Sequence, residues 1–231
     1  TLFIDTLNRY LRTKGYKRLA VIKTEDPFLN SLTDALRNTL TGSENMQVLV
    51  SFSPGDSDFK SAIARLRGGA FDAVGLYLFP GQVSSFYRQL AAVNLKIPTF
   101  GSDIFDSRTE IANAGPAMQG AVFPNVEVPE EFRTRYREMF GNDLQLAYGY
   151  NAYITFKAIA QLVRLRDESP QKEFSNLLLE PSAYTGLKEF ELNKDKFGGI
   201  YFDFPLEMRE VRGEGTELVT ATYIPIFKNK N

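Results

Sequence analysis

The sequence predicts an α/β protein built on a parallel sheet with helices on both of its faces. Short apolar, β-branched runs alternate three times with longer segments whose apolar residues recur at the helical period, and a fourth apolar run follows. The third run, FDAVGLYLF at 71–79, is apolar nearly throughout. This is typical of a parallel strand that is covered on both faces.

The first half of the chain supplies three strand–helix pairs and a fourth strand. The predicted strands are RLAVIK at 18–23, MQVLVSF at 46–52, FDAVGLYLF at 71–79 and IPTFGS at 97–102. Helices are predicted between them at 26–40, 56–69 and 81–95. Asp26 before Pro27 predicts an N-cap followed by a proline at the first helical position, and Gly68-Gly69 predicts a helix end.

The pattern changes after residue 103. The Gly- and Pro-punctuated segment at 114–129 is predicted to be an extended crossing with a small strand at 120–123. Helices are predicted at 129–141, 147–167 and 169–181, and strands and turns from 184 onward, with a turn at 214–217. The helix at 147–167 is apolar over more than one stripe, so we expect it to need partners on more than one side.

Composition excludes several classes of function. The chain has 231 residues, and its 27 Lys and Arg against 28 Asp and Glu give no electrostatic reason to expect a nucleic-acid partner. It contains no Cys and no His, which excludes thiol or imidazole catalysis and Cys or His zinc sites. We predict no enzyme activity, no catalytic residue, no metal and no cofactor. No apolar run approaches the roughly 20 residues that span a bilayer.

Three residues follow the ends of predicted strands. Phe28, Phe79 and Asp103 each lie just past such an end. Parallel α/β sheets bind ligands in the crevice beyond the carboxyl ends of their strands. We therefore expect these three residues to face the same side of the sheet.

The order of elements resembles a known family. The stretches YKRLAVIKTEDPFLN, GLYLFPGQVSSFYRQLAAVNLKIPTFGSD, AYGYNAYITFKAIA and LEMREVRGEG occur at 16–30, 75–103, 147–160 and 206–215. In this order they resemble type I periplasmic binding proteins of the leucine/isoleucine/valine-binding group, the substrate-binding components of ABC importers for branched-chain amino acids and related compounds. The resemblance implies two α/β lobes, joined by three crossings, that close around a ligand.

The resemblance also implies a domain organisation. Residues 1–125 would form the second lobe, 206–231 would return to it, and 126–205 would hold first-lobe helices and crossing segments. Members of the family begin with a first-lobe sheet that would precede Thr1, so we expect the chain to be a fragment whose first lobe is incomplete. Otherwise another copy or a partner must cover the apolar faces of the helices at 129–180.

The resemblance assigns roles to four residues. Asp103, in the family's Gly-x-acid context, would pair with the α-ammonium of a ligand; the alternative is that it caps the following turn. Phe28 and Phe79 would line the pocket for the ligand side chain, or pack in the core. In the family the position of Phe79 is familiar as a tyrosine, and the phenylalanine lacks the hydroxyl donor that a tyrosine would offer a polar ligand group. Tyr150 would lie near the hinge and the cleft, or pack in the core.

The predicted function is extracytoplasmic solute binding. A small amphipathic ligand, an amino acid or a relative, would be delivered to a membrane ABC permease from a periplasmic or extracellular location, with a lipid anchor as an option. The alternative is a ligand-degenerate scaffold of the same fold, such as the lipoprotein activators of penicillin-binding proteins. A flavodoxin- or dehydrogenase-type enzyme is disfavoured because the chain has neither a glycine-rich first loop nor a base. Sugar-responsive transcription regulators share the architecture, but the YGYNAY helix fits them less well.

Overall fold

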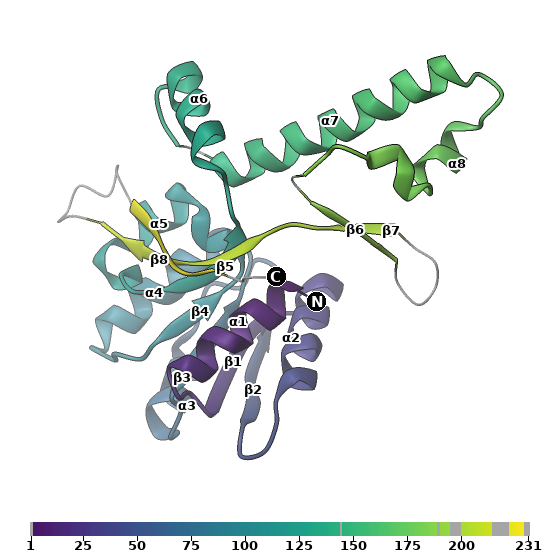
Figure 1. Cartoon of the computed structure of the whole chain (residues 1–231). Coiled ribbons are helices and arrows are strands. Elements are labelled where there is room, and N and C mark those ends of the chain that lie inside the picture. Colours follow the sequence, from purple (N-terminus) through teal and green to yellow (C-terminus); the bar gives the residue numbers. More distant parts are fainter. Residues whose placement is uncertain (1, 144, 189, 195–199, 214–221, 229–231) are drawn as a thin grey trace. The chain divides into compact units, whose positions relative to one another are not determined.

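A computed structural model describes residues 2–143, 145–188, 190–194, 200–213 and 222–228 (Figure 1). The helices are α1 (Leu2–Thr13), α2 (Pro27–Thr39), α3 (Lys60–Gly68), α4 (Gln82–Ala92), α5 (Arg108–Ala114), α6 (Glu130–Phe140), α7 (Leu146–Glu168) and α8 (Phe174–Leu178). The strands are β1 (Arg18–Thr24), β2 (Asn45–Phe52), β3 (Ala73–Tyr77), β4 (Thr99–Gly101), β5 (Val122–Val126), β6 (Glu191–Lys194), β7 (Ile200–Asp203), β8 (Leu206–Arg212) and β9 (Thr222–Lys228). Three 3-10 turns are η1 (Asp103–Asp106), η2 (Gly115–Met118) and η3 (Pro181–Tyr184).

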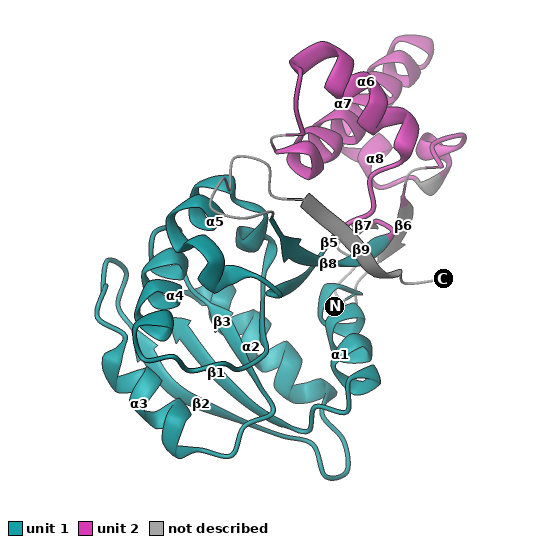
Figure 2. Cartoon of the chain, turned by 90° about the vertical axis from the view of Figure 1, so that its left-hand side faces the viewer, with its two compact units in different colours: residues 1–125, 206–229 teal, residues 126–205, 230–231 magenta. Residues whose placement is uncertain are grey.

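The chain divides into two compact units (Figure 2). Unit 1 consists of residues 1–125 and 206–229, and unit 2 of residues 126–205 and 230–231. Unit 1 holds a seven-stranded sheet in the order β2-β1-β3-β4-β5-β8-β9. The strands from β2 to β5 pair in parallel, whereas β8 and β9 are antiparallel.

Helices cover both faces of the unit 1 sheet. Along β1, Leu19 and Val21 join the core beneath α1 and α2, whereas Ala20 and Ile22 join the core beneath α3, α4 and α5. A strand that is buried on both faces needs apolar residues at successive positions, which is the pattern read from the sequence. The predicted fold class, a largely parallel α/β sheet with helices on both faces, is confirmed.

Local signals at helix ends are confirmed at two places. The Oδ1 of Asp26 accepts hydrogen bonds from the backbone N–H groups of Phe28 (2.9 Å) and Leu29 (3.2 Å), so Asp26 is the N-cap of α2 and Pro27 its first residue. Helix α3 ends at Gly68, with Gly69 as its C-cap. These are interactions between residues close in sequence, which is why a short stretch predicts them.

Two predicted helices differ in extent from the structure, and one helix was not predicted. Helix α3 starts at Lys60 instead of residue 56, because the Asp56 carboxylate accepts the N–H of Ser53 (2.7 Å) and closes a turn there. Helix α8 spans only Phe174–Leu178, because Ser169 terminates α7 and does not begin the next helix. Helix α5 was not predicted; it begins at the Ser107 cap. The predicted turn at 214–217 lies outside the described residues.

Unit 2 consists of helices α6, α7 and α8 and the antiparallel pair β6-β7. One stripe of α7 is buried; it comprises Leu146, Ala147, Tyr150, Ile154, Ala158 and Leu162. A second apolar stripe is exposed, and Phe156 on it is 71% exposed. The broad apolar surface expected from the sequence is therefore present, and the described residues cover only part of it.

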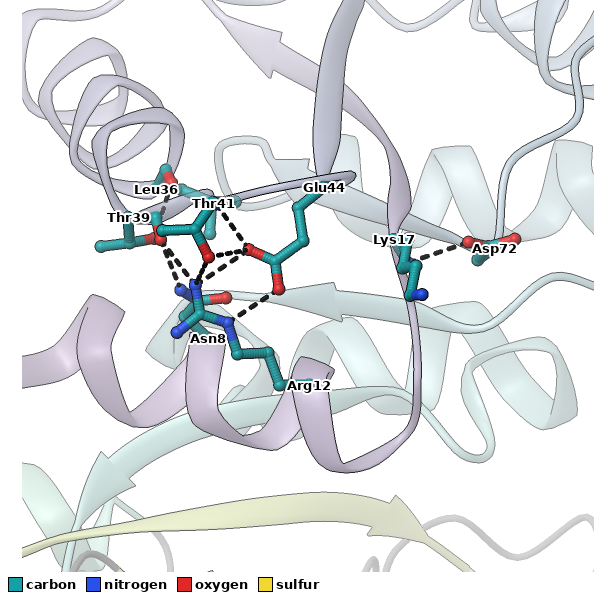
Figure 3. A network of polar contacts seen from close by, with 8 residues as sticks. All are labelled: Asn8, Arg12, Lys17, Leu36, Thr39, Thr41, Glu44 and Asp72. Carbon is teal, nitrogen blue, oxygen red and sulfur yellow. Dashed lines mark hydrogen bonds and ion pairs between the residues drawn. The ribbon is translucent and has the colours of Figure 1, made fainter.

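A polar network ties α1 to the α2–β2 connection at the amino edge of the sheet (Figure 3). Arg12 donates from Nε and Nη2 to the carboxylate of Glu44 (2.7 and 2.9 Å), and Nη2 also donates to Thr39 O (2.8 Å). The Arg12 contact lowers the pKa of Glu44 to about 2. Asp72, which immediately precedes β3, accepts hydrogen bonds from the Arg18 side chain and from the backbone N–H groups of Lys17 and Arg18 at the start of β1. These bonds lower the pKa of Asp72 to about 2.

We expect these two carboxylates to make unit 1 acid-sensitive. Because their folded pKa values lie below the ordinary values of 4.5 and 3.8, their stabilisation is complete above about pH 4.5 and is lost as the pH falls toward about 2. Each should contribute about 1 kcal/mol after solvent screening, or roughly 2–4 °C in melting temperature. Melting temperature measured from pH 6 to pH 2 should fall less steeply in Glu44→Gln and Asp72→Asn variants. Identical slopes would contradict this.

Candidate functional site

The candidate site is the carboxyl edge of the parallel sheet in unit 1. Register pairs Lys23 of β1 with Tyr77 of β3, and Leu76 of β3 with Gly101 of β4, so the three strands end at the same edge. Phe28, Phe79 and Asp103 follow these ends in the described structure. Loops at this edge position ligands in parallel α/β sheets.

Phe28 lies in the first turn of α2. Its side chain is 61% exposed, although it is a large apolar ring. The Asp26 cap holds the backbone N–H of Phe28 and so fixes where the ring emerges. Core packing, the alternative for this residue, does not occur in the described structure.

Phe79 follows β3 and is half-buried. Its ring packs at the border of the core beneath α1 and α2, and its N–H donates to the Gln82 side chain at 3.0 Å. Part of the ring is therefore held by core contacts and part remains exposed.

Asp103 is the first residue of η1 and is half-buried. The side-chain cap of this turn is Ser102, whose Oγ accepts the N–H of Ile104 at 3.4 Å. At the other end of the turn, Asp106 accepts a hydrogen bond from Asn125 Nδ2 of β5 (2.9 Å). Residues on either side of Asp103 thus anchor the turn that presents it.

Close packing requires a glycine at position 101, the first residue of the GSD stretch. A Cβ added at Gly101 would lie 2.5 Å from the Phe105 ring and 3.0 Å from Leu76 O, and Phe105 is fully buried within η1. The close approach of Phe105 to the strand backbone is what seats the turn that carries Asp103.

We expect Gly101→Ala to displace η1. Overpacking of this kind typically costs about 1–3 kcal/mol, and here the ring that must move belongs to the turn with Asp103. Chemical denaturation should show the loss of stability. A Gly120→Ala variant is not a suitable control because Gly120 has φ +80°, whereas Gly68→Ala meets nothing within 4 Å and should change stability little. Equal effects at residues 101 and 68 would contradict the packing argument.

Several ionisable side chains lie at this edge of the sheet. The pKa of Glu25, just after β1, is lowered by hydrogen bonds with Ser51 and Asn30 and by the Lys23 charge. Asp26 lies on the same loop as Glu25, Asp103 and Asp106 lie after β4 and are followed by Arg108, and Lys23 lies 3.4 Å from Glu25. A cation placed here would meet carboxylates that can accept its hydrogen bonds.

Tyr150 belongs to unit 2. It is 3% exposed, and its ring centroid lies 5.0 Å from that of Phe132 on α6. It also lines a groove of about 690 Å³ between α6 and α7, together with the aromatic residues Phe132, Tyr136, Phe140 and Tyr153. Packing within unit 2 is therefore the role that the described contacts give to Tyr150.

Sequence reasoning missed two buried polar residues at the edge, Gln82 and Glu110. Each binds backbone groups of loops that are distant in sequence. Gln82 could have been noticed because it is a polar residue that directly follows the glycine at the start of a helix. Nothing local marks Glu110. Among the described residues, no group of three or more His, Cys, Asp or Glu is arranged to hold a metal ion.

The fold is that of a class of α/β binding modules, in which ligands bind beyond the carboxyl ends of the strands. Residues 4–173 match the family described as periplasmic binding protein, and the chain belongs to that family. Membership agrees with the predicted class, a binding protein and not an enzyme. No curated protein matches the chain closely enough to be counted. None of the described helices combines the length and the apolar character needed to cross a membrane.

Solved structures share the fold. A leucine-binding protein LivK from Thermotoga maritima is 17% identical, with a TM-score of 0.73, and the match covers 97% of this chain and 64% of that protein. A putative branched-chain amino acid ABC transporter protein from Rhodospirillum rubrum is 21% identical (TM-score 0.67; 97% and 66% covered). A solute-binding protein from R. palustris in complex with 4-hydroxybenzoate is 15% identical (TM-score 0.66; 100% and 66% covered). The chain thus spans about two thirds of the length of these proteins.

Proposed function

We propose that this chain is the larger part of an extracytoplasmic solute-binding protein that captures a small amphipathic ligand for an ABC importer. The observation that carries the proposal is the half-buried Asp103 on an anchored turn, at the same strand-end edge as the exposed ring of Phe28. An acid and an exposed aromatic ring at the same edge of the sheet suit a ligand with an ammonium group and an apolar side chain. The ligand class is an amino acid or a relative.

The proposed mechanism is a population shift. Open and closed arrangements of two lobes interconvert, and a ligand that contacts both lobes favours the closed one. Asp103 accepts the ammonium, whereas Phe28 and Phe79 contact the side chain. The carboxylate of the ligand is held by hydrogen-bond donors outside unit 1. The closed form is then recognised by the membrane permease, at the periplasmic or outer face of the membrane.

A thermal-shift screen tests the proposal. The intact protein is screened against amino acids, with leucine first, and against aromatic carboxylates, with benzoate and 4-hydroxybenzoate first. A ligand present at about 100 times its Kd should add about 2.7 kcal/mol, which corresponds to several degrees. A hit among amino acids supports the proposal. A hit only among aromatic acids keeps solute binding and overturns the ammonium assignment.

A scaffold function is the second candidate, and the exposed apolar residues of unit 2 favour it. Met139, Phe156 and Leu179 are 76%, 71% and 53% exposed. Surfaces of this kind often contact other proteins. A flat ligand screen on well-folded protein, together with a loss of protein–protein association in a Phe156→Ser variant, would favour this function over solute binding.

A further inference from the structure

We propose that Gln82 is a positioning residue that joins three loops of the candidate site into one arrangement before any ligand arrives. The inference rests on the proposed function only in taking these loops as the ligand site. Gln82 is the first residue of α4 and is 5% exposed. Gly81 before it has φ +84°, a left-handed conformation that favours glycine and lets the chain turn sharply from β3 into the helix.

The Gln82 amide uses its full hydrogen-bonding capacity. Oε1 accepts from Thr24 Oγ1 (2.5 Å), at the end of β1, and from the Phe79 N–H (3.0 Å), after β3. Nε2 donates to Ser53 O (3.2 Å) and Asp56 O (2.9 Å), in the loop after β2. An amide offers two acceptor positions and two donors, so all four are engaged.

Three of these four bonds connect segments that are far apart in sequence. Thr24 and Gln82 are 58 residues apart, and Ser53 and Gln82 are 29 apart. The amide is buried, where hydrogen bonds are less weakened by water and an unmade one is more unfavourable. A single side chain therefore fixes the mutual position of the loops after β1, β2 and β3, including the loop that carries Phe79.

Glu110 extends the arrangement to the fourth loop. It lies on α5, just after the η1 turn that carries Asp103, and is 3% exposed. Its carboxylate accepts the N–H groups of Gly81 (2.5 Å) and Ser84 (2.7 Å) in the first turn of α4. The first turn of α4 is thus the junction of all four loops. Because these N–H groups already bind a carboxylate, they are not free to hold an anionic ligand group, which agrees with a positive group facing this edge.

Helix α4 supplies a matched control, Gln89. Its Oε1 accepts the Phe59 N–H (2.8 Å) and its Nε2 donates to Ser57 O (2.7 Å). Gln89 therefore joins α4 to the same loop after β2, seven positions further along the helix, but its two amide bonds reach neither the loop after β1 nor the loop after β3. Replacing either glutamine by leucine removes an amide of the same size from the same helix.

Residue-resolved amide hydrogen exchange of the full chain tests the positioning role. In Gln82→Leu, exchange at the Phe79 amide, which donates to Gln82, should be at least about tenfold faster than in the parent, whereas Gln89→Leu should leave the Phe79 amide unchanged. Tenfold corresponds to about 1.4 kcal/mol in opening free energy. Equal effects in the two variants, or no change at Phe79 in Gln82→Leu, would overturn the proposal.

Two further variants guard against misfolding. Thr24→Val removes one of the four bonds with little change in volume, and should accelerate exchange at Phe79 by a smaller factor. In Gln82→Glu, the ionised carboxylate would face the carbonyl oxygens of Ser53 and Asp56 and could donate to neither. The protonated carboxylic acid can donate a hydrogen bond to one of these oxygens. Protection relative to the parent should therefore recover as the pH is lowered. A Gln82→Glu variant with the same protection deficit at all pH values would contradict the proposed bonding.

Ligand titrations distinguish a failure of this inference from a failure of the proposed function. Leucine and benzoate are titrated into the intact protein and into the two leucine variants at a temperature where all are folded. If either compound binds, Gln82→Leu should weaken it at least about tenfold more than Gln89→Leu, and equal weakening would overturn the link to binding. If neither compound binds, neither is the ligand, and the exchange data alone decide whether Gln82 positions the loops.

Discussion

Replacing Asp103 by asparagine is expected to lower the affinity for an α-amino acid by about 10- to 150-fold. The change retains the size of the side chain but removes its charge, and a hydrogen bond to a charged group is worth about 1.5–3 kcal/mol. The turn that presents the residue should survive, because its cap is Ser102 and its far end is held by Asp106 and Asn125. Isothermal titration of the intact protein with the amino acid found in the screen measures the loss.

The control is Asp34→Asn. Asp34 pairs with Arg37 (2.6 Å) on an exposed surface of α2. The Asp34→Asn substitution therefore removes the same charge as Asp103→Asn without altering the candidate site. Its affinity should equal that of the parent. Unchanged affinity in the Asp103→Asn variant would contradict the proposal that Asp103 binds the ammonium group of the ligand. An increase, together with binding of an aromatic carboxylate, would mean that Asp103 repels the charge of the true ligand.

Replacing Glu207 by alanine is expected to destabilise unit 1 by about 3–5 kcal/mol, because it leaves a buried guanidinium without its counter-charge. Glu207 and Arg209 lie on one face of β8, and both side chains are 3% exposed. Arg209 Nε donates to Glu207 Oε1 at 2.8 Å, and Nη2 lies 2.6 Å from the same oxygen without the alignment of a hydrogen bond. Urea denaturation followed by circular dichroism measures the loss.

The same strand offers the control. Glu210 and Arg212 have the same spacing and a 2.9 Å contact, but their side chains are 23% and 53% exposed. Glu210→Ala should therefore cost about 1 kcal/mol or less. A double replacement, Glu207→Leu with Arg209→Met, should recover much of the stability because no charge remains buried. Equal losses for Glu207→Ala and Glu210→Ala would contradict the burial argument.

Local chemistry explains which elements could be predicted. Asp26, Pro27 and Gly68-Gly69 act on residues within a turn of themselves, so their roles follow from short stretches. Helix α5 escaped prediction because seven residues give too short a period to recognise. Helix α8 was overextended because Ser169-Pro170 has the composition of a helix start, whereas Ser169 ends α7.

The candidate site was predictable only in part. The strand-end rule gathers Phe28, Phe79 and Asp103 because parallel strands share a direction, and this follows from the order of elements. It does not say that Phe28 is exposed and Phe79 half-buried, because burial depends on what packs above each ring. The burial of Tyr150 against Phe132 likewise depends on how α6 packs against α7 and not on the residues next to Tyr150 in the sequence.

The sequence by itself determined the alternation of strands and helices, the absence of Cys and His, and the acid at the end of the fourth strand. The tertiary structure alone decided that Gln82 and Glu110 join the four loops around that acid, and that Glu207 and Arg209 are buried as a pair. The physical reason is range. Periodicity and capping act over a few residues, whereas a buried amide or carboxylate takes its partners from whichever strand ends the folded sheet brings beside it.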